Sequence, residues 1–143
     1  MKESDLQVKV ADYIRLKYPN VLFHSDFGSG IKMTKGQAIK QKRQNGGRRG
    51  WPDLFIAEPR ELTTFDVKTN RDVPTGKFYR GLFIELKKEG TRIRKKDGSP
   101  ASKHIAEQDA MLKALWLRGY QTFFAVGFDE AKKIIDWYLG GEK

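Results

Sequence analysis

Two short apolar runs with high β-propensity constrain the fold of this chain more than any other feature. The first covers residues 53–56 and begins with Asp53, and the second covers residues 82–87 and carries Glu85 near its end. Both runs have the length of a strand and are bounded by Gly or Pro, which is typical of strand ends. If they pair as neighbouring antiparallel strands, the carboxylates of Asp53 and Glu85 meet at one end of the pair.

A third polar side chain would join these carboxylates. Because side chains alternate between the two faces of a strand, Lys87 points the same way as Glu85. Two carboxylates can hold a hard divalent cation, and an amine beside them can handle a water proton or a developing anion. The pattern therefore predicts a small site with metal-assisted chemistry.

Pro-Asp, a spacer and Glu-x-Lys resemble the motif of the PD-(D/E)XK nuclease superfamily. The flanks Gly-x-Pro-Asp-Leu at 50–54 and Gly-Leu-Phe-Ile-Glu-Leu-Lys at 81–87, followed by Gln108 in a later helix, look like the virus-type replication–repair nuclease domain, VRR-NUC. The resemblance covers nearly the whole chain, from Glu3 to the last helix. It implies a single restriction-endonuclease-like α/β domain over residues 1–143, with a mixed sheet flanked by helices.

A second segment also satisfies the later half of the motif. Asp66-x-Lys68 stands at a plausible distance from Asp53. Its apolar run is shorter, and residues 69–74 after it have the composition of a loop. Since the flanks that resemble the family surround Glu85, we favour Glu85 over Asp66 as the partner of Asp53.

The rest of the chain alternates helical and strand patterns. Apolar periodicity predicts helices over residues 4–18, 102–118 and from about 128, and strands over residues 21–24 and 120–126. Asp129 is the predicted N-cap of the last helix. This order independently indicates one α/β domain around a mixed sheet.

Two more polar residues lie on apolar helical stripes. Glu3 either complements the positive N-terminus of the first helix or faces the site, and the resemblance implies the second. Gln108 interrupts the stripe of the 102–118 helix, and a buried amide needs hydrogen-bond partners. It either caps a core loop or orients a water or Lys87; the matching Gln of the family lies at the site.

The resemblance implies roles for these residues. Asp53 and Glu85 would bind Mg²⁺ or Mn²⁺, the Leu86 carbonyl would complete the ligand set, and Glu3 would act directly or through water. Lys87 would position or deprotonate the attacking water. The implied catalytic set is Glu3, Asp53, Glu85, Lys87 and Gln108.

The chain is strongly basic, with a formal net charge of +10 and a pI of about 9.8. Such an excess indicates a polyanionic partner, most simply nucleic acid.

Residues 28–50 hold Lys and Arg but no acid, and their glycines predict a mobile basic loop with a short helix over 34–44. A second basic segment with an Asp97-Gly98 turn signal follows the motif. These segments are either solvated faces or phosphate contacts. The residues that we assign to DNA binding are Lys40, Lys42, Arg43, Arg48, Arg49, Lys88, Arg92 and Arg94.

Composition excludes several classes of protein. Of the 143 residues 38% are hydrophobic and 12% aromatic, which indicates one folded domain rather than disorder. The absence of cysteine excludes disulfides and thiolate zinc sites. No apolar run reaches membrane-spanning length and the N-terminal residues do not resemble a signal peptide. We therefore expect no membrane partner and a location in the cytoplasm of a bacterial or phage-infected cell.

These observations predict a metal-dependent, structure-selective DNA nuclease that hydrolyses phosphodiester bonds in replication, repair or recombination. The resemblance implies branched, flapped or junction DNA as the substrate and a homodimer as the assembly. Alternatives are a basic nucleic-acid-binding module or accessory subunit without catalysis, an archaeal-type Holliday junction resolvase, and a restriction-like endonuclease.

Overall fold

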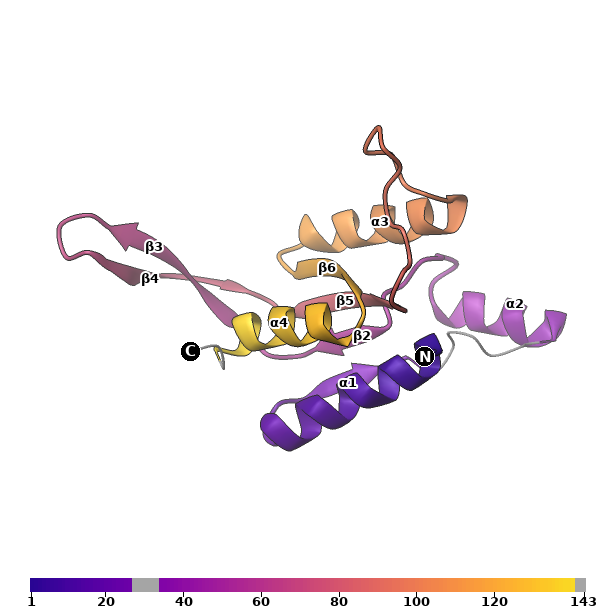
Figure 1. Cartoon of the computed structure of the whole chain (residues 1–143), viewed down its shortest axis with the longest axis horizontal. Helices are drawn as coiled ribbons and strands as arrows, with labels where there is room; N and C mark the ends of the chain where they lie inside the picture. The colour runs from indigo at the N-terminus through magenta and orange to yellow at the C-terminus, as the bar shows by residue number, and fades with distance from the viewer. Residues whose placement is uncertain (27–33, 141–143) are drawn as a thin grey trace.

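A small mixed sheet with helices on both faces forms the centre of the molecule (Figure 1). The computed structural model describes residues 1–26 and 34–140. Over these residues the helices are α1 (Glu3–Lys17), α2 (Lys35–Gln44), α3 (Lys103–Trp116) and α4 (Phe128–Leu139). The strands are β1 (Phe23–Ser25), β2 (Leu54–Ile56), β3 (Arg60–Asp66), β4 (Arg71–Tyr79), β5 (Leu82–Lys87) and β6 (Gln121–Val126).

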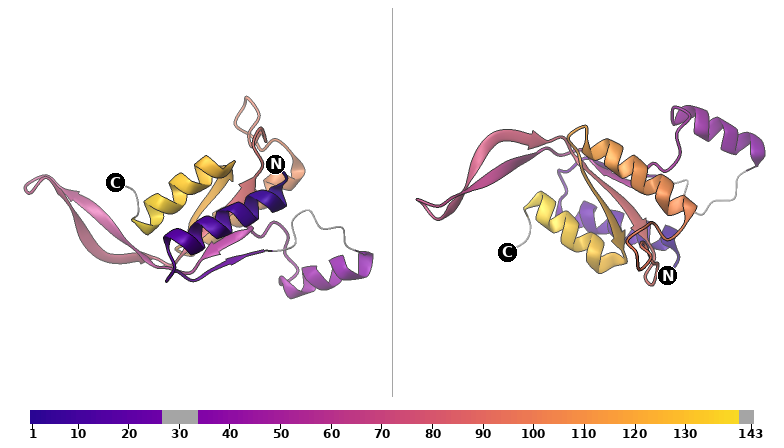
Figure 2. Two further views of the ribbon diagram at one scale, coloured as in Figure 1. Left: turned by 60° about the horizontal axis from the view of Figure 1, so that its bottom comes forward. Right: turned by 90° about the horizontal axis from the view of Figure 1, so that it is seen from above.

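Four strands form the main sheet in the order β1-β2-β5-β6. The pairs β1–β2 and β2–β5 are antiparallel, whereas β5–β6 is parallel and is connected through α3. A parallel pair needs such a crossover because its strands run the same way. α1 and α4 cover one face of the sheet, and α3 lies across the other (Figure 2). The predicted α/β class with a mixed sheet is confirmed.

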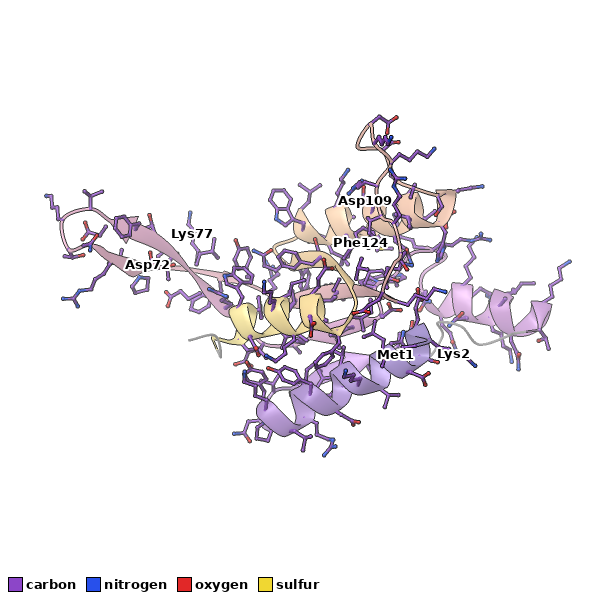
Figure 3. All side chains as sticks on the ribbon, in the orientation of Figure 1. Met1, Lys2, Asp72, Lys77, Asp109 and Phe124 are labelled. Carbon is purple, nitrogen blue, oxygen red and sulfur yellow. The ribbon has the colours of Figure 1, made fainter. Side chains whose placement is uncertain are left out.

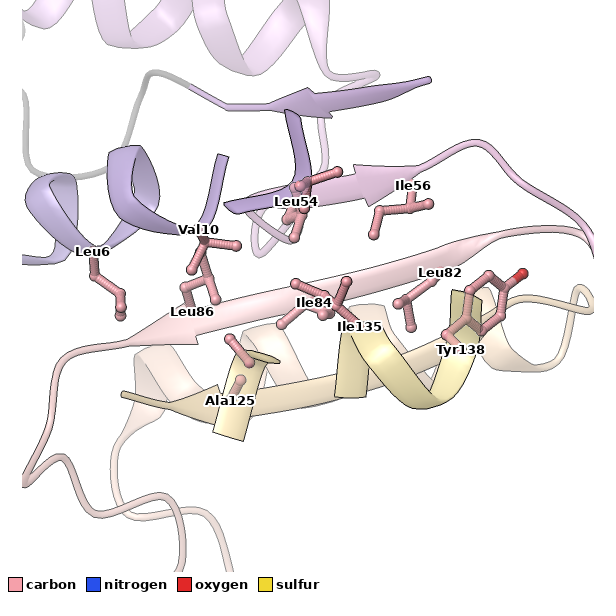
Figure 4. Close-up of a cluster of buried hydrophobic side chains, with 12 residues drawn as sticks. Leu6, Val10, Leu54, Ile56, Leu82, Ile84, Leu86, Ala125, Ile135 and Tyr138 are labelled. Atoms are coloured by element: carbon pink, nitrogen blue, oxygen red, sulfur yellow. The ribbon is translucent and has the colours of Figure 1, made fainter. Parts of the chain in front are cut away.

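The hydrophobic core lies between the sheet and the layer of α1 and α4 (Figure 4). In α1 every fourth residue enters the core, and in the strands every second residue does. The fully buried side chains include Leu6, Val10 and Ile14 of α1, Leu54 and Ile56 of β2, Leu82, Ile84 and Leu86 of β5, and Ile135 of α4. Because alternate residues of β5 enter this core, the residues between them face α3.

β3 and β4 form a separate ribbon that projects from the main sheet (Figure 1). The prediction of a loop over residues 69–74 was wrong from Arg71 onward, since β4 begins there. The chain reverses over residues 67–70, where Asn70 adopts a φ of 55°, a left-handed conformation that Asn tolerates. Pro74 is accommodated because each strand of a two-stranded ribbon has an open edge.

The N-terminus of α4 also differs from the prediction. Gly127, not Asp129, occupies the N-cap position, and its φ is 85°. A Cβ on Gly127 would lie 2.7 Å from Cγ of Glu89. The backbone N–H of Gly127 donates to the Lys87 carbonyl at 2.8 Å, so the strand pairing continues up to the helix. Glycine is therefore required where the chain turns from β6 into α4.

No helix within residues 1–26 and 34–140 is long and apolar enough to cross a membrane.

A buried carboxylate fastens α1 to α4. Oδ1 of Asp136 accepts hydrogen bonds from the hydroxyls of Tyr13 (2.5 Å) and Tyr18 (2.6 Å) and from Nζ of Lys17 (3.0 Å). Burial acts to raise the pKa of Asp136, but these donors together outweigh burial and lower it. The ionised form of Asp136 therefore stabilises the fold.

We expect Asp136→Asn to lower the free energy of unfolding by about 2 kcal/mol at pH 7, because a neutral amide accepts weaker hydrogen bonds than a carboxylate. Urea unfolding measures this. Asp12→Asn removes only an exposed ion pair with Arg15 and should cost less than about 0.5 kcal/mol. The ionised carboxylate of Asp136 stabilises the fold only at pH values above the ordinary pKa of a carboxyl group. The loss of unfolding free energy in Asp136→Asn should therefore shrink as the pH falls below about 4. An equal deficit at pH 7 and pH 3 would contradict this account.

Candidate active site

The register of β2 and β5 brings two acidic side chains together. Leu54 lies opposite Ile84 in this antiparallel pair, so the next position places Asp53 opposite Glu85. Oδ2 of Asp53 accepts a hydrogen bond from the backbone N–H of Leu86 at 2.9 Å. The carboxylate of Asp53 is thereby held across the end of β5. The predicted antiparallel pairing of the two runs is confirmed.

Lys87 and Gln108 complete the immediate surroundings of Glu85. Nζ of Lys87 lies 3.6 Å from Oε1 of Glu85, and Nε2 of Gln108 donates to the same oxygen at 2.7 Å. All these side chains are buried, and Glu85 is only 2% exposed. Oε2 of Glu85 and Oε1 of Gln108 are buried without a hydrogen-bond partner among the described residues. Two oxygens are thus left to face a ligand.

The two carboxyls strongly affect each other's protonation. Burial raises the pKa of Glu85 to about 9, and the charge and hydrogen bonding of Asp53 add to the rise. Burial also raises the pKa of Asp53. The positive charge of Lys87 opposes both shifts. Two buried carboxyls this close cannot both ionise easily, which favours one proton shared by the pair.

Glu3 adds a third acidic group from the first turn of α1. Its negative charge contributes to the raised pKa of both Asp53 and Glu85. Gln7, one helical turn further on, is buried, and its Nε2 has no hydrogen-bond partner within the described part of the chain. α1 therefore presents polar groups to the site at one end and apolar groups to the core along the rest of its buried face.

The donor set fits a hard divalent cation with few protein ligands. No group of three or more His, Cys, Asp or Glu side chains within residues 1–26 and 34–140 is arranged to hold a metal. Asp53 and Glu85 would supply two carboxylates, and the remaining ligands would be backbone, water or substrate oxygens. Mg²⁺ is usually bound in this way, through one or two carboxylates and the substrate's phosphate. The unpartnered Oε2 of Glu85 is consistent with such an ion.

A cleft of about 360 Å³ opens onto Asp53 and Glu85. Its walls come from the C-terminal half of α2, the segment 48–51 and the N-terminal half of α3. Lys42, Arg48 and Arg49 bring positive charge to its rim. The site thus combines a carboxylate floor with cationic walls, an arrangement suited to a phosphate group above a metal ion.

A solved structure described as "VRR_NUC domain protein" resembles this chain with a TM-score of 0.62. The two sequences are 24% identical, and the match covers 98% of this chain and 89% of that one. The chain has a VRR-NUC-like fold. No protein-family model matches the sequence, and no curated protein is significantly similar to it. The fold that the motif and its flanks imply is therefore confirmed.

Within the VRR-NUC-like fold, the rival motif lies far from the site. Oδ1 of Asp66 accepts from the backbone N–H of Lys68, and Oδ2 accepts from the Thr69 hydroxyl, each at 3.0 Å. Asp66 thus stabilises the turn at the outer end of the ribbon. The neighbouring Asp72 and the α3 residue Asp109 are labelled far apart in Figure 3. The ribbon keeps this motif away from Asp53.

The predicted DNA-binding residues occupy different places. Lys42, Arg48 and Arg49 line the cleft. Both terminal nitrogens of Arg94 bind the Asp109 carboxylate, at 2.9 and 3.2 Å, which fastens the basic loop after β5 to α3. Arg94 thereby has a structural partner. The other four are exposed and do not line the cleft: Lys40, Arg43, Lys88 and Arg92.

The basic segment 28–50 contains a helix as predicted. Residues 28–33 lie outside the described residues. The Thr34 hydroxyl accepts from the Gln37 N–H at 3.1 Å, and the Gln37 side chain accepts from the Thr34 N–H at 2.9 Å, a reciprocal capping box that starts α2. Nε1 of Trp51 donates to the Asn45 carbonyl at 3.2 Å and ties the helix end to the cleft wall.

Sequence reasoning missed three ionisable residues that line the cleft: Asp26, His104 and Glu107. Nε2 of His104 lies 3.2 Å from Nε2 of Gln108. Their spacing of four residues places them on one helix face, a signal readable from the sequence. The backbone N–H of Asp26 donates to the Asp53 carbonyl at 2.6 Å. Its position depends on the β1–β2 register, which the sequence does not reveal.

The raised pKa of Glu85 predicts how stability depends on pH. A group whose pKa is higher in the folded state stabilises the fold when protonated, and this stability is lost as the pH rises through the folded pKa. In EDTA, the melting temperature should therefore decline between about pH 5 and pH 9. Glu85→Gln cannot ionise, so it should lack this part of the decline and exceed the wild type in stability at pH 9.

The matched control is Glu58→Gln, which removes an exposed carboxylate. It should follow the wild-type curve at every pH. Parallel pH profiles for the wild type and Glu85→Gln would show that the Glu85 pKa is not raised.

Proposed function

We propose that this chain is a metal-dependent nuclease that hydrolyses DNA phosphodiester bonds. The observation that carries the proposal is the meeting of two nearly fully buried carboxyls, Asp53 and Glu85, at the floor of a cleft with cationic walls, with the buried Lys87 beside Glu85. Burying two carboxyls and an amine opposes folding, so such clusters are concentrated at functional sites. The VRR-NUC-like fold supports the same interpretation.

Asp53 and Glu85 are the residues that would hold Mg²⁺ or Mn²⁺. Such an ion supplies a nucleophile at neutral pH and shields the negative charge of the substrate. One oxygen of each carboxylate is oriented by a hydrogen bond, from the Leu86 N–H to Asp53 and from Gln108 to Glu85. This leaves Oε2 of Glu85 to bind the ion. The Leu86 carbonyl and Glu3 are proposed to complete the set, Glu3 directly or through water.

Lys87 is proposed to act on the reacting groups. Its amine is buried beside Glu85, where a charge has a stronger effect than in water. It would position the attacking water or accept its proton, and it would offset the negative charge that develops on the phosphate. Gln108 is a positioning residue, since its amide fixes Glu85, and through Glu85 the ion.

The finer parts of the proposal rest on the resemblance of the motifs. They are a preference for branched or flapped DNA, a role in replication, repair or recombination, and assembly as a homodimer. The positive charge of Lys42, Arg48 and Arg49 at the cleft supports a polyanionic substrate but does not select its shape.

Cleavage of a panel of labelled DNAs tests the function. Single-strand, duplex, flap, splayed and four-way substrates are incubated with Mn²⁺ or with EDTA. Cleavage with Mn²⁺ that EDTA abolishes is expected. Binding without cleavage of any substrate would indicate a non-catalytic DNA-binding module, and cleavage at one base sequence irrespective of shape would indicate a restriction-like enzyme.

Asp53→Asn and Glu85→Gln should each remove most cleavage, because each takes away a carboxylate charge that the ion requires. DNA binding and folding should be largely retained. The matched control is Asp66→Asn, which changes the rival motif at the ribbon turn and should cleave like the wild type. Wild-type rates in Asp53→Asn, or loss of activity in Asp66→Asn alone, would refute the assignment.

Lys87→Ala should lower the cleavage rate by about a hundredfold or more, the usual scale for one acid–base or charge-stabilising group. Lys87→Arg should recover little of it, because arginine stays protonated and its planar group is larger. Calorimetry with Mn²⁺ should show a far smaller loss of metal affinity in Lys87→Ala than in Asp53→Asn. Near-normal turnover by Lys87→Ala would remove Lys87 from the mechanism.

A further inference from the structure

Two hollows continue from the cleft along the outer side of α3. A groove of about 530 Å³ shares Arg48, Arg49, Trp51 and Glu107 with the cleft and follows α3 to Arg118. Arg118 also lines a shallow hollow beside the base of the β3–β4 ribbon. The cleft, the groove and this hollow form one connected surface, which we call the α3 track.

Arginines and aromatic rings lie together at both ends of the α3 track, and the groove between them is lined by Ala110, Met111, Ala114 and Leu115. Trp51, 39% exposed, stands where the cleft meets the groove. Arg118, Tyr120, Arg80 and Phe78 line the far hollow, and Phe78 is 54% exposed. Each end of the track therefore offers cations for phosphates and aromatic rings for bases.

A glycine makes room for one of these arginines. A Cβ on Gly119 would lie 3.1 Å from Nε of Arg80, so the Arg80 side chain lies directly over the Gly119 backbone. The Arg80 N–H also donates to the Gly119 carbonyl at 2.8 Å. Arg80 is thereby fixed at the end of the track, on the side of the sheet that α3 covers.

We propose that the α3 track binds a single DNA strand that leads from the cleft along α3 to the base of the ribbon. The inference rests on the proposed nuclease function and assigns a place to the single-stranded arm of its substrate. Proteins hold single strands by combining a cationic groove that follows the phosphates with aromatic side chains on which the bases stack. The α3 track has both, and it is continuous with the site of cleavage.

A second copy of the chain is the competing occupant. In a two-fold symmetric interface the same surface meets itself. The arginines of the groove would then face one another, and Glu107 is the only acidic residue among the described lining residues of the groove and far hollow. Like charges across an interface are unfavourable. Charge complementarity therefore favours a DNA strand.

The test measures binding rather than cleavage. Fluorescence anisotropy of the full chain in EDTA is recorded with labelled oligothymidylates of about 4, 8, 12 and 16 nucleotides, the range over which single-strand sites saturate. Affinity should rise with length and then level off. Phe78→Ala should weaken binding of the longest strand about tenfold, the scale of one stacked base, with little effect on the shortest.

Phe65→Ala is the matched control, because Phe65 lies in the outer part of the same ribbon with a similar exposure of 56%. It should bind every strand like the wild type. Arg118→Ala should reduce the slope of log K against log salt by about 0.7, the value for one phosphate contact on a single strand. Arg118→Lys keeps the charge and should keep the slope, whereas Arg15→Ala on the α1 side should change nothing.

Arg118 also donates to the Ala114 carbonyl at 2.8 Å, so thermal melts verify that each variant is folded. Wild-type affinity and salt slope in folded Phe78→Ala and Arg118→Ala would overturn the proposal. The proposal would also be overturned if these variants changed sedimentation of the chain but not DNA binding. That result would assign the surface to a second copy. Because EDTA prevents metal-dependent cleavage, this assay tests strand binding by the α3 track independently of the cleavage assay that tests the proposed nuclease function.

Discussion

The antiparallel register of β2 and β5 determines which side chains lie side by side on each face of the sheet. On one face it places Leu54 beside Ile84 in the core under α1 and α4; on the other it places Asp53 beside Glu85. Because side chains alternate along a strand, a slip of one residue would turn Glu85 into the core and Leu86 toward the cleft. Each buried aliphatic side chain contributes about 1.5–3 kcal/mol. The core therefore fixes the geometry of the site.

The site in turn opposes the stability that the core provides. Burial raises the pKa of Glu85 and Asp53 because neither carboxylate is well solvated, and Glu3 adds further negative charge. Lys87, Gln108 and the Leu86 N–H compensate in part. Oε2 of Glu85 and Oε1 of Gln108 have no hydrogen-bond partner among the described residues, and such atoms are typical of places where a ligand binds.

The parts of this structure that were predictable from sequence are those with a periodic apolar signal. Asp53 and Glu85 were placed because their strands are buried, and Gln108 because it interrupts a buried helical stripe. The β3–β4 ribbon was not recognised because most of its side chains are exposed on both faces, so residues such as Phe65 and Val67 carry no alternating pattern. The partner of Arg94 depends on how α3 packs against the loop after β5, which local sequence does not encode.

Charge at the cleft depends on the protonation of Glu85. With Glu85 protonated, fewer carboxylates oppose the positive charge of Lys42, Arg48 and Arg49 than the sequence suggests. Replacement of that proton by a divalent ion adds one further positive charge at the floor. Under the proposed function, metal and DNA therefore favour each other's binding, and by thermodynamic linkage the enhancement is equal in both directions. Under that function, the burial that makes the carboxyl pair costly for folding would also prevent its negative charge from repelling DNA before the metal binds.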